Sequence, residues 1–275
     1  MTQPASTIAQ AEAIFPGAAR LPLRRRVKAW LPAGVAVSLM LFLAQDLGLA
    51  PATFLSGLAR LGGFFGSMWP PSDGGVFWRV VGALAETFAM AFAGTSIAVV
   101  LSVPLGLIGA KTIVPFAPVH FLVRRTFDFF RGVPALVWAL VFVSAFGLGP
   151  FAGVVALVLA DIPMMSKLYA EAFENVDPKP AEGMRSAGID KLRTIRFATV
   201  PQVLPVLASQ ALYFLESNFR NAAVLGIVGA GGIGFELEER IRIFAFDQVL
   251  FIILLYMLCV TGLDTISSKI RARLV

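Results

Sequence analysis

Two long stretches of this 275-residue chain contain no charged side chain, one from Thr87 to Ala110 and the other from Gly132 to Ala160. A helix rises about 1.5 Å per residue, so a bilayer core of about 30 Å requires roughly 20 apolar residues. The first stretch therefore predicts one membrane span. The second is long enough for two spans, and the turn sequence Gly-Leu-Gly-Pro at 147–150 interrupts it.

The whole pattern predicts an all-α, polytopic membrane protein with about six transmembrane helices. We expect spans at about 31–49, 86–110, 125–146, 151–170, 202–225 and 247–267. Pro51–Val80 is expected to be a loop because it contains Gly-Gly, Trp-Pro-Pro and Ser-Asp-Gly-Gly. Residues 1–30 would form a tail that ends in a basic amphipathic helix at Arg20–Trp30, and residues 31–275 a transmembrane domain. A cleaved leader is the alternative to the first span.

The basic residues are distributed unevenly between the two sides of the predicted membrane. With the N-terminus inside, 18 of the 23 Lys and Arg residues fall on the cytoplasmic side and 5 on the outer side. This bias predicts that both termini are cytoplasmic. It also accounts for the net charge of +6, so we expect membrane lipid and no nucleic acid as a partner. With one cysteine, Cys259, and one histidine, His120, no metal site is expected.

A charged segment from Glu182 to Pro201 separates the fourth and fifth expected spans. Gly188 divides it, because a residue without a Cβ allows a turn that other residues resist. We expect short helices at Glu182–Ala187 and Asp190–Thr199 on the cytoplasmic side. An ordinary solvated loop is the alternative interpretation.

This segment resembles the cytoplasmic loop of ATP-binding-cassette importer permeases, whose consensus is Glu-Ala-Ala, three residues, Gly, nine residues and Ile-x-Leu-Pro. Glu182, Gly188 and Pro201 match its anchors at the same spacing. The departures from the consensus are Gly183, Met184, Ala198 and Val200. The resemblance implies that a coupling loop at about 174–201 docks on a separate ATPase subunit. The residues implied to take part are Glu182, Arg185, Gly188, Asp190 and Pro201.

Three longer stretches, EAFENVDPKPAEGMRSAG, FRGVPALVWALVFV and ESNFRNAAVLGIVGAGGIGFEL, are similar to phosphonate importer permeases, a subfamily that includes phosphite transporters. The resemblance covers Thr87 to the C-terminus. It implies a type I importer permease fold, a homodimer in the bacterial cytoplasmic (inner) membrane, and a periplasmic or lipid-anchored substrate-binding protein as partner.

The chain contains no Gly-x-x-x-x-Gly-Lys-Ser/Thr sequence, so it is expected to have no cofactor and no enzymatic activity of its own. ATP and Mg²⁺ would be bound by the partner ATPase, in two copies. The alternatives are an importer permease for another small solute and an ion-coupled secondary transporter, although a secondary transporter would be expected to show internal repeats. A membrane-embedded oxidoreductase is a third possibility.

The glycine-rich run GIVGAGGIG contains the spacing Gly-x-Gly-x-x-Gly at Gly229, Gly231 and Gly234. A dinucleotide site with this spacing needs alternating strands and helices, which the pattern does not predict. Closely packed backbones at a helix end are the simpler interpretation. The family resemblance implies an external gate that includes Gly229, Gly231, Gly232 and Gly234.

Charged residues also fall in or beside the expected spans, where a charge at mid-membrane costs about 2.5–3.5 kcal/mol. They are Asp46, Glu86, Asp128, Asp161, Glu216, Arg220 and Asp264. For Asp46, Asp161 and Asp264 the alternative is a position near a helix end, at headgroup level.

Glu216 and Arg220 are four residues apart on one helical face. One hypothesis is that Arg220, with Asn218 and Asn221, lines the translocation path, because a guanidinium suits the oxygens of a phosphorus oxyanion. Glu216 would then temper the affinity of Arg220. The alternative is that Glu216 and Arg220 form a purely structural ion pair.

Overall fold

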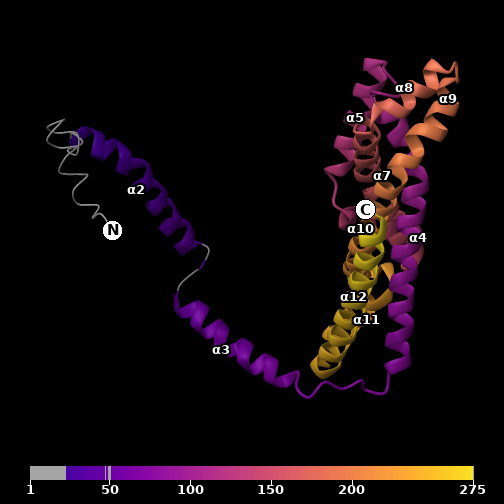
Figure 1. The fold of residues 1–275 in the computed structure, drawn as a ribbon. Coiled ribbons are helices and arrows are strands. Elements are labelled where there is room, and N and C mark those ends of the chain that lie inside the picture. Colours follow the sequence, from indigo (N-terminus) through magenta and orange to yellow (C-terminus); the bar gives the residue numbers. More distant parts are fainter. Residues whose placement is uncertain (1–22, 47, 49–50, 275) are drawn as a thin grey trace, which may run out of the picture. The chain divides into compact units, whose positions relative to one another are not determined.

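The computed structural model describes residues 23–46, 48 and 51–274, and every regular element among them is helical (Figure 1). The all-α prediction is therefore confirmed. The chain divides into two units, one ending at Gly66 and one beginning at Ser67.

The first unit contains α2 (Leu23–Asp46) and α3 (Pro51–Ser67). The apolar stretch of α2, Trp30–Ala44, exposes almost all of its side chains, as expected of a helix that lipid would surround. It overlaps the expected first span. The helix continues through residue 30, where the sequence placed the end of the tail, and part of the expected basic helix at Arg20–Trp30 lies outside the described residues.

The helix α3 corrects the sequence prediction, which placed a loop from Pro51 onward. Proline is favourable in the first turn of a helix, and apolar residues at helical spacing continue past Gly62 and Gly63 to the end of α3. The later turn signals are interpreted correctly, because the residues between Ser67 and Phe77 are not helical.

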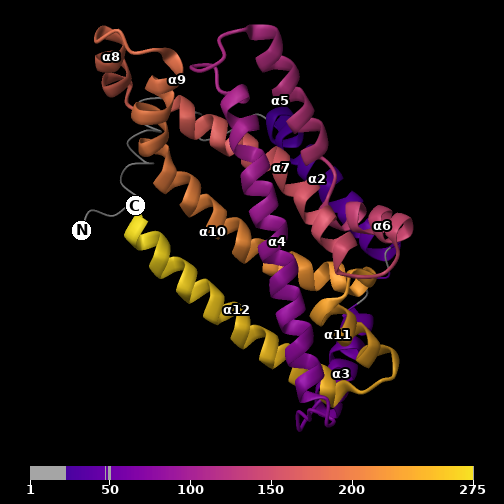
Figure 2. The same ribbon diagram turned by 90° about the vertical axis from the view of Figure 1, so that its right-hand side faces the viewer.

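The second unit consists of helices and of two π-helical turns, one at each end of α10. The helices are α4 (Phe77–Gly109), α5 (Ala117–Arg131), α6 (Ala135–Phe146), α7 (Pro150–Glu174), α8 (Pro178–Ser186), α9 (Lys191–Thr194), α10 (Val200–Leu225), α11 (Gly232–Arg242) and α12 (Phe246–Leu274), and the π turns are η1 (Ile195–Thr199) and η2 (Gly226–Ala230). Figure 2 shows α8 and α9 at one end of this unit, and α11 at the end where α4 and α12 begin.

Among the described residues, four helices are long and apolar enough to cross a membrane: α4, α7, α12 and the continuous helix Lys191–Ala230 that contains α10. The pair α5 and α6 adds a fifth if it counts as one broken span. The expected span at about 125–146 is not one continuous helix, because α5 and α6 are bent by 80° relative to each other. Gly132 and Pro134 explain the bend, since proline removes a helical hydrogen bond. The first expected span, at about 31–49, overlaps the shorter apolar stretch Trp30–Ala44 of α2.

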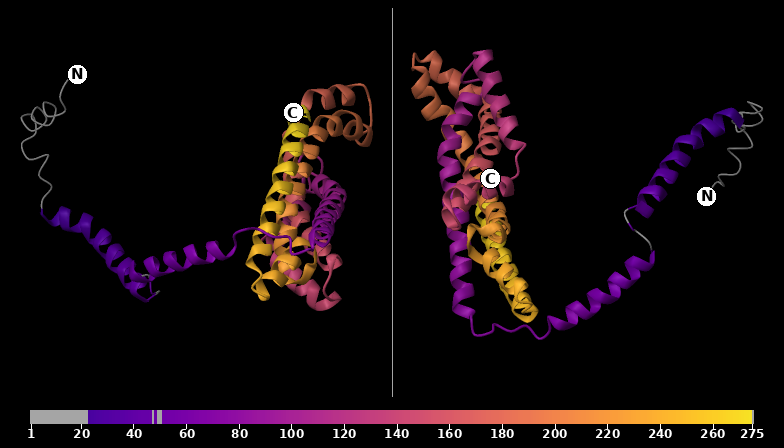
Figure 3. Two further views of the ribbon diagram at one scale, coloured as in Figure 1. Left: turned by 90° about the horizontal axis from the view of Figure 1, so that it is seen from below. Right: turned by 180° about the vertical axis from the view of Figure 1, so that it is seen from behind.

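Small residues hold α4 and α7 together. A Cβ added at Gly94 would lie 3.0 Å from the Cβ of Leu157, and one added at Gly106 would lie 2.7 Å from the Cβ of Tyr169. Such glycines allow close approach in a membrane, where packing drives helix association. The core of the second unit lies between α4, α7 and α10, and α8 and α9 project from its end (Figure 3).

Candidate functional site

The α8–α9 hairpin (Pro178–Thr194) occupies the charged insertion. The Asp177 carboxylate caps α8 by accepting a hydrogen bond from the Lys179 N–H at 3.0 Å. The helix begins at Pro178 rather than at Glu182, because this cap and the proline provide an earlier start. Its last residue, Ser186, is one residue from the predicted end.

The turn between the two helices is made at Gly188, whose φ is +77°. Its N–H donates to the Arg185 carbonyl at 2.9 Å, and the Ile189 N–H donates to the Met184 carbonyl at 3.1 Å. These bonds satisfy carbonyls that the end of α8 leaves free. An added Cβ at Gly188 would meet no atom of the described residues within 4 Å, so the glycine is required for its backbone conformation and not for space. The predicted glycine turn is confirmed.

The return helix starts after Asp190. The Thr194 N–H and Oγ1 each donate to the Asp190 carbonyl at 3.0 Å, and Arg193 pairs with the Asp190 carboxylate at 3.2 Å. The helix then continues through η1 into α10, with Pro201 in the first turn of α10. The predicted short helix at Asp190–Thr199 is therefore the beginning of a long helix. The second half of the hairpin is therefore directly continuous with α10.

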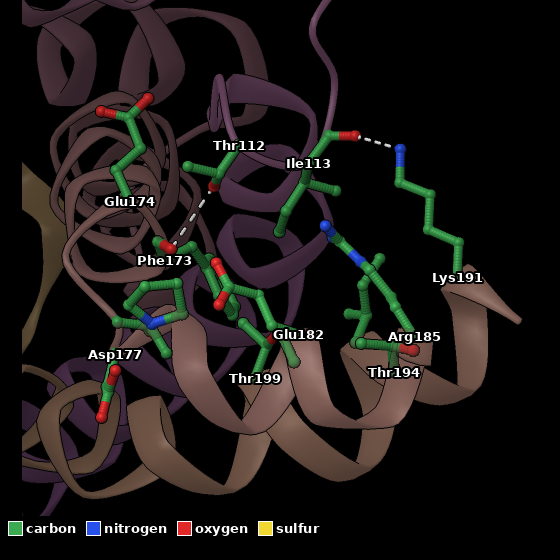
Figure 4. A pocket seen from close by; sticks show the side chains of 14 residues that line it. Thr112, Ile113, Phe173, Glu174, Asp177, Glu182, Arg185, Lys191, Thr194 and Thr199 are labelled. Atoms are coloured by element: carbon green, nitrogen blue, oxygen red, sulfur yellow. Dashed lines mark hydrogen bonds between the residues drawn. The ribbon is translucent and has the colours of Figure 1, made fainter. Parts of the chain in front are cut away.

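Beneath the hairpin lies a cavity of about 250 Å³ (Figure 4). Glu182 and Arg185 line it from α8, and Thr199 lines it from η1. On its far rim Lys191 Nζ donates to the carbonyl of Ile113, in the connection between α4 and α5, at 2.7 Å. This bond links the hairpin to a second part of the helical bundle.

Glu174, the last residue of α7, contacts α5 and the connection that follows α4. Its Oε1 accepts from the Lys111 N–H at 2.8 Å and from Arg124 Nη2 at 2.9 Å. Two turns before Glu174 in α7, Lys167 pairs with Asp128 of α5 at 3.0 Å. The hairpin therefore starts from a junction at which α4, α5 and α7 are tied together.

Asn218 is completely buried in α10. Its Nδ2 donates to Thr95 Oγ1 on α4 at 2.9 Å and to the Asp161 carboxylate on α7. Asp161 is itself buried in the middle of α7, so the headgroup interpretation is wrong for this residue. The sequence did not predict that Asn218 contacts Thr95 and Asp161, because nothing in a single sequence relates positions so far apart.

The same geometry separates Asn218 from Arg220. At about 100° per residue the two side chains lie on opposite faces of α10. Asn218 faces α4 and α7, whereas the Arg220 side chain is 45% exposed. Asn221 is partly exposed. Asn218 and Arg220 were expected to line the translocation path together. Within one copy of the chain they cannot do so, because the helix places them on opposite faces.

The expected ion pair between Glu216 and Arg220 is also wrong. Glu216, which is buried, accepts from Arg271 Nη2 at 2.8 Å, and Arg220 Nη1 donates to Asp264 at 3.0 Å. Both partners come from α12, which packs beside α10 and offers oppositely charged groups at closer range. The side chain of Asp46 is not among those that the structure describes.

The glycine-rich run forms η2 and the first turn of α11, and it is packed against other helices. A Cβ at Gly229 would strike Leu148, one at Gly231 would strike Glu86, and one at Gly232 would strike Thr87. A Cβ at Gly234 would collide with the Ala223 carbonyl oxygen. The Ile233 N–H donates to Thr87 Oγ1 at 2.8 Å. The expected close packing of backbones is confirmed.

A charged cluster on α11 was not singled out from the sequence. Arg79, near the start of α4, pairs with Glu236 at 2.7 Å and with Glu239 at 2.6 Å, and Arg240 pairs with Glu236 at 3.3 Å. The spacing of four residues between Glu236 and Arg240 was the available signal. The cluster fixes α11 across the start of α4.

Comparisons with known proteins match most of the chain. A family profile described as a binding-protein-dependent transport system inner membrane component matches residues 102–275. The phosphite transport system permease protein PtxC of Stutzerimonas stutzeri is 39% identical over 226 residues, which are 82% of this chain and 82% of that protein. The phosphate-import permease protein PhnE of Mycolicibacterium smegmatis is 35% identical over 254 residues, which are 92% of this chain but 48% of that longer protein.

Solved structures show the same fold. An inward-facing structure of the MetNI methionine ABC transporter matches with a TM-score of 0.65 at 23% identity, covering 74% of this chain and 99% of that chain. An amino acid ABC transporter matches with a TM-score of 0.60, covering 70% and 93% of the two chains.

Proposed function

This chain belongs to the family of binding-protein-dependent transport system inner membrane components and has the fold of an importer permease, and from this premise we propose that it carries phosphonate or phosphite into the bacterial cytoplasm. The substrate class is supported by relatives named as phosphite and phosphonate transport permeases at 37–45% identity. The chain is a transport subunit. ATP would be hydrolysed, with Mg²⁺, by two copies of a separate ATPase.

The α8–α9 hairpin is the proposed contact with that ATPase. It is rigid, because its turn and both helix starts are hydrogen-bonded, and it exposes Glu182, Arg185 and Asp190. It also continues into α10 and is tied to the α4–α5 connection through Lys191. A short lever with these links would turn closure of an ATPase pair into tilting of the membrane helices. Two-fold symmetry of the motor favours a homodimer of this chain.

The Arg220–Asp264 pair is the observation that most supports passage of an anion. Both side chains are nearly half exposed although both belong to membrane-spanning helices. A charge that faces lipid at mid-membrane costs about 2.5–3.5 kcal/mol, so charged residues within spans face water or protein. We assign this face of α10 and α12 to the path between two copies. Asp264 neutralises Arg220, so an oxyanion would be held weakly enough to leave.

The remaining assignments complete the cycle. The glycine-rich run, with Gly229, Gly231, Gly232 and Gly234, would form the external gate, and a periplasmic or lipid-anchored binding protein would deliver the substrate there. With both termini in the cytoplasm, α8 and α9 face the ATPase. ATP binding would open the dimer outward, and hydrolysis would return it to the inward state.

Uptake into proteoliposomes tests the proposal. The chain is reconstituted with its partner ATPase and binding protein, and ATP-dependent accumulation of phosphite, methylphosphonate and methionine is measured. We expect accumulation of at least one phosphorus oxyanion and none of methionine. The methionine arm matters because a probable D-methionine permease of Haemophilus influenzae is 26% identical over 212 residues. Accumulation of methionine alone would overturn the assigned substrate.

Variants of Arg220 test the path. Arg220→Ala should reduce uptake strongly, and Arg220→Lys, which keeps the charge but loses the planar pair of donors, should reduce it less. Unchanged uptake in both variants would remove Arg220 from the path.

A further inference from the structure

The helix α3 (Pro51–Ser67) has an amphipathic surface that no part of the proposed transport cycle uses. Its apolar stripe consists of Phe54, Leu58, Leu61 and Phe65, spaced at intervals of three and four residues. Phe54 is 71% exposed, Leu58 55% and Phe65 64%. Exposed apolar side chains in one continuous stripe indicate a surface that contacts something other than water.

The opposite side of α3 is mostly polar or small, with Phe64 at its edge. It carries Thr53, Ser56, Arg60, Gly63 and Ser67, which recur at the same helical spacing. Arg60 is the one charged residue of the helix and lies near its middle. A helix with 17 residues is about 25 Å long, which is short for a bilayer core of about 30 Å. The polar stripe along its whole length is a second reason why α3 does not cross the membrane.

The neighbours of α3 in the chain keep it at a membrane surface. Four residues separate it from α2, a reach of at most about 17 Å, and nine separate it from α4, at most about 34 Å. Both neighbours are apolar helices, and α4 is long enough to span. The connection to α4 also carries Trp69, which is 71% exposed, and Trp78 at the start of α4 is 80% exposed. Aromatic residues of this kind concentrate at the membrane–water interface.

We propose that α3 lies flat in the membrane surface and that its binding partner is the lipid bilayer. Phe54, Leu58, Leu61 and Phe65 enter the acyl region, and the stripe with Ser56 and Gly63 faces the headgroups and water. Arg60 extends toward lipid phosphates, as long basic side chains do at this depth. In the proposed orientation this surface is the outer leaflet. The helix then anchors the connection between the first span and α4, independently of which solute is carried.

Spin labelling at matched positions tests this directly. Single cysteines are placed at Leu58 and Phe65 on the apolar stripe and at Ser56 and Gly63 on the polar stripe, in full-length protein in which Cys259→Ser removes the native thiol. The labelled protein is reconstituted in phosphatidylcholine–phosphatidylglycerol vesicles. Accessibility to oxygen, which partitions into lipid, is compared with accessibility to a water-soluble nickel chelate. A position whose variant does not insert is replaced by Leu61 or Arg60 of the same stripe.

The expected result is higher oxygen than nickel accessibility at Leu58 and Phe65, and the reverse at Ser56 and Gly63. Nickel access at all four positions would place α3 in water and overturn the proposal. Exclusion of both reagents at Leu58 and Phe65 would mean that protein, such as a second copy, covers the stripe. Oxygen access at all four positions would mean that α3 is immersed in the bilayer. Either of these outcomes would also overturn the proposal.

Discussion

At one end of the second unit the chain turns at Gly188, and at the other it turns through the glycine-rich run. Gly188, Gly229, Gly231 and Gly232 all have positive φ. An added Cβ at Gly188 would meet no described atom within 4 Å, whereas at each of the other three it would strike a side chain from another segment of the chain. One turn thus requires a backbone conformation alone, and the other requires both conformation and space. The open turn is exposed, whereas the packed turn is held by other parts of the chain.

The packed turn should tolerate almost no added volume. In Gly234→Ala the new methyl group would collide with the Ala223 carbonyl oxygen and the Gly226 Cα, which are backbone atoms and cannot rotate away. We expect the free energy of unfolding to fall by at least about 3 kcal/mol. The fall is detected as a lower thermal midpoint of the purified protein in detergent. Gly262→Ala is the control, because a Cβ there meets nothing within 4 Å. Equal midpoints for the two variants would show that the run is not tightly packed.

Thr87 tests the hydrogen bond that holds the packed turn. Thr87→Val keeps the shape of the side chain but leaves the buried Ile233 N–H without its acceptor. The expected loss of stability is about 1–3 kcal/mol. Thr87→Ser, which keeps the hydroxyl, should lose less. If Val and Ser variants melt alike, the bond between α4 and α11 contributes little.

The open turn should be far less sensitive in stability. Gly188→Val strains a backbone at positive φ by about 1–2 kcal/mol and creates no clash. The protein should still insert and elute as the wild type does in size-exclusion chromatography. Gly183→Ala, in the middle of α8 of the same hairpin, should instead gain about 0.5–1 kcal/mol. Failure of Gly188→Val to insert would remove the contrast between the two turns.

The smallest expected effect concerns the link from the hairpin to the bundle. Lys191→Met removes the bond to the Ile113 carbonyl, worth about 0.5–1.5 kcal/mol. We expect near-normal melting but a fall of about two- to tenfold in anions transported per ATP hydrolysed. Lys179→Met, which removes a charge from α8 and keeps the Ile113 bond, is the matched control. An unchanged ratio in Lys191→Met would mean that force reaches the bundle through α10 alone.

Local signals predicted much of this molecule. The uncharged runs located α4 and α7, the sequence Gly-Leu-Gly-Pro located the turn before α7, and the position of Gly188 located the hairpin turn. Each of these features depends on neighbours in the chain. The helix α3 was not predicted from the sequence. Gly62 and Gly63 were interpreted as a turn, and the helical spacing of the apolar residues on either side of them was given less weight.

The polar contacts within the membrane could not be predicted in the same way. Glu216 and Arg220 are correctly placed to pair on one helix, but α12 brings Arg271 and Asp264 closer. Asn218 finds Asp161 and Thr95 on two other helices. These choices depend on how the helices pack, and a single sequence does not record that packing.

The central claim is that force from a separate ATPase enters this chain at the open turn. The most direct measurement is ATP-dependent uptake of phosphite or methylphosphonate by proteoliposomes that contain the ATPase, the binding protein and either Gly188→Val or Gly183→Ala. The account predicts that both variants insert equally and that Gly188→Val loses most of its uptake while Gly183→Ala keeps it. Undiminished uptake by correctly inserted Gly188→Val would contradict it.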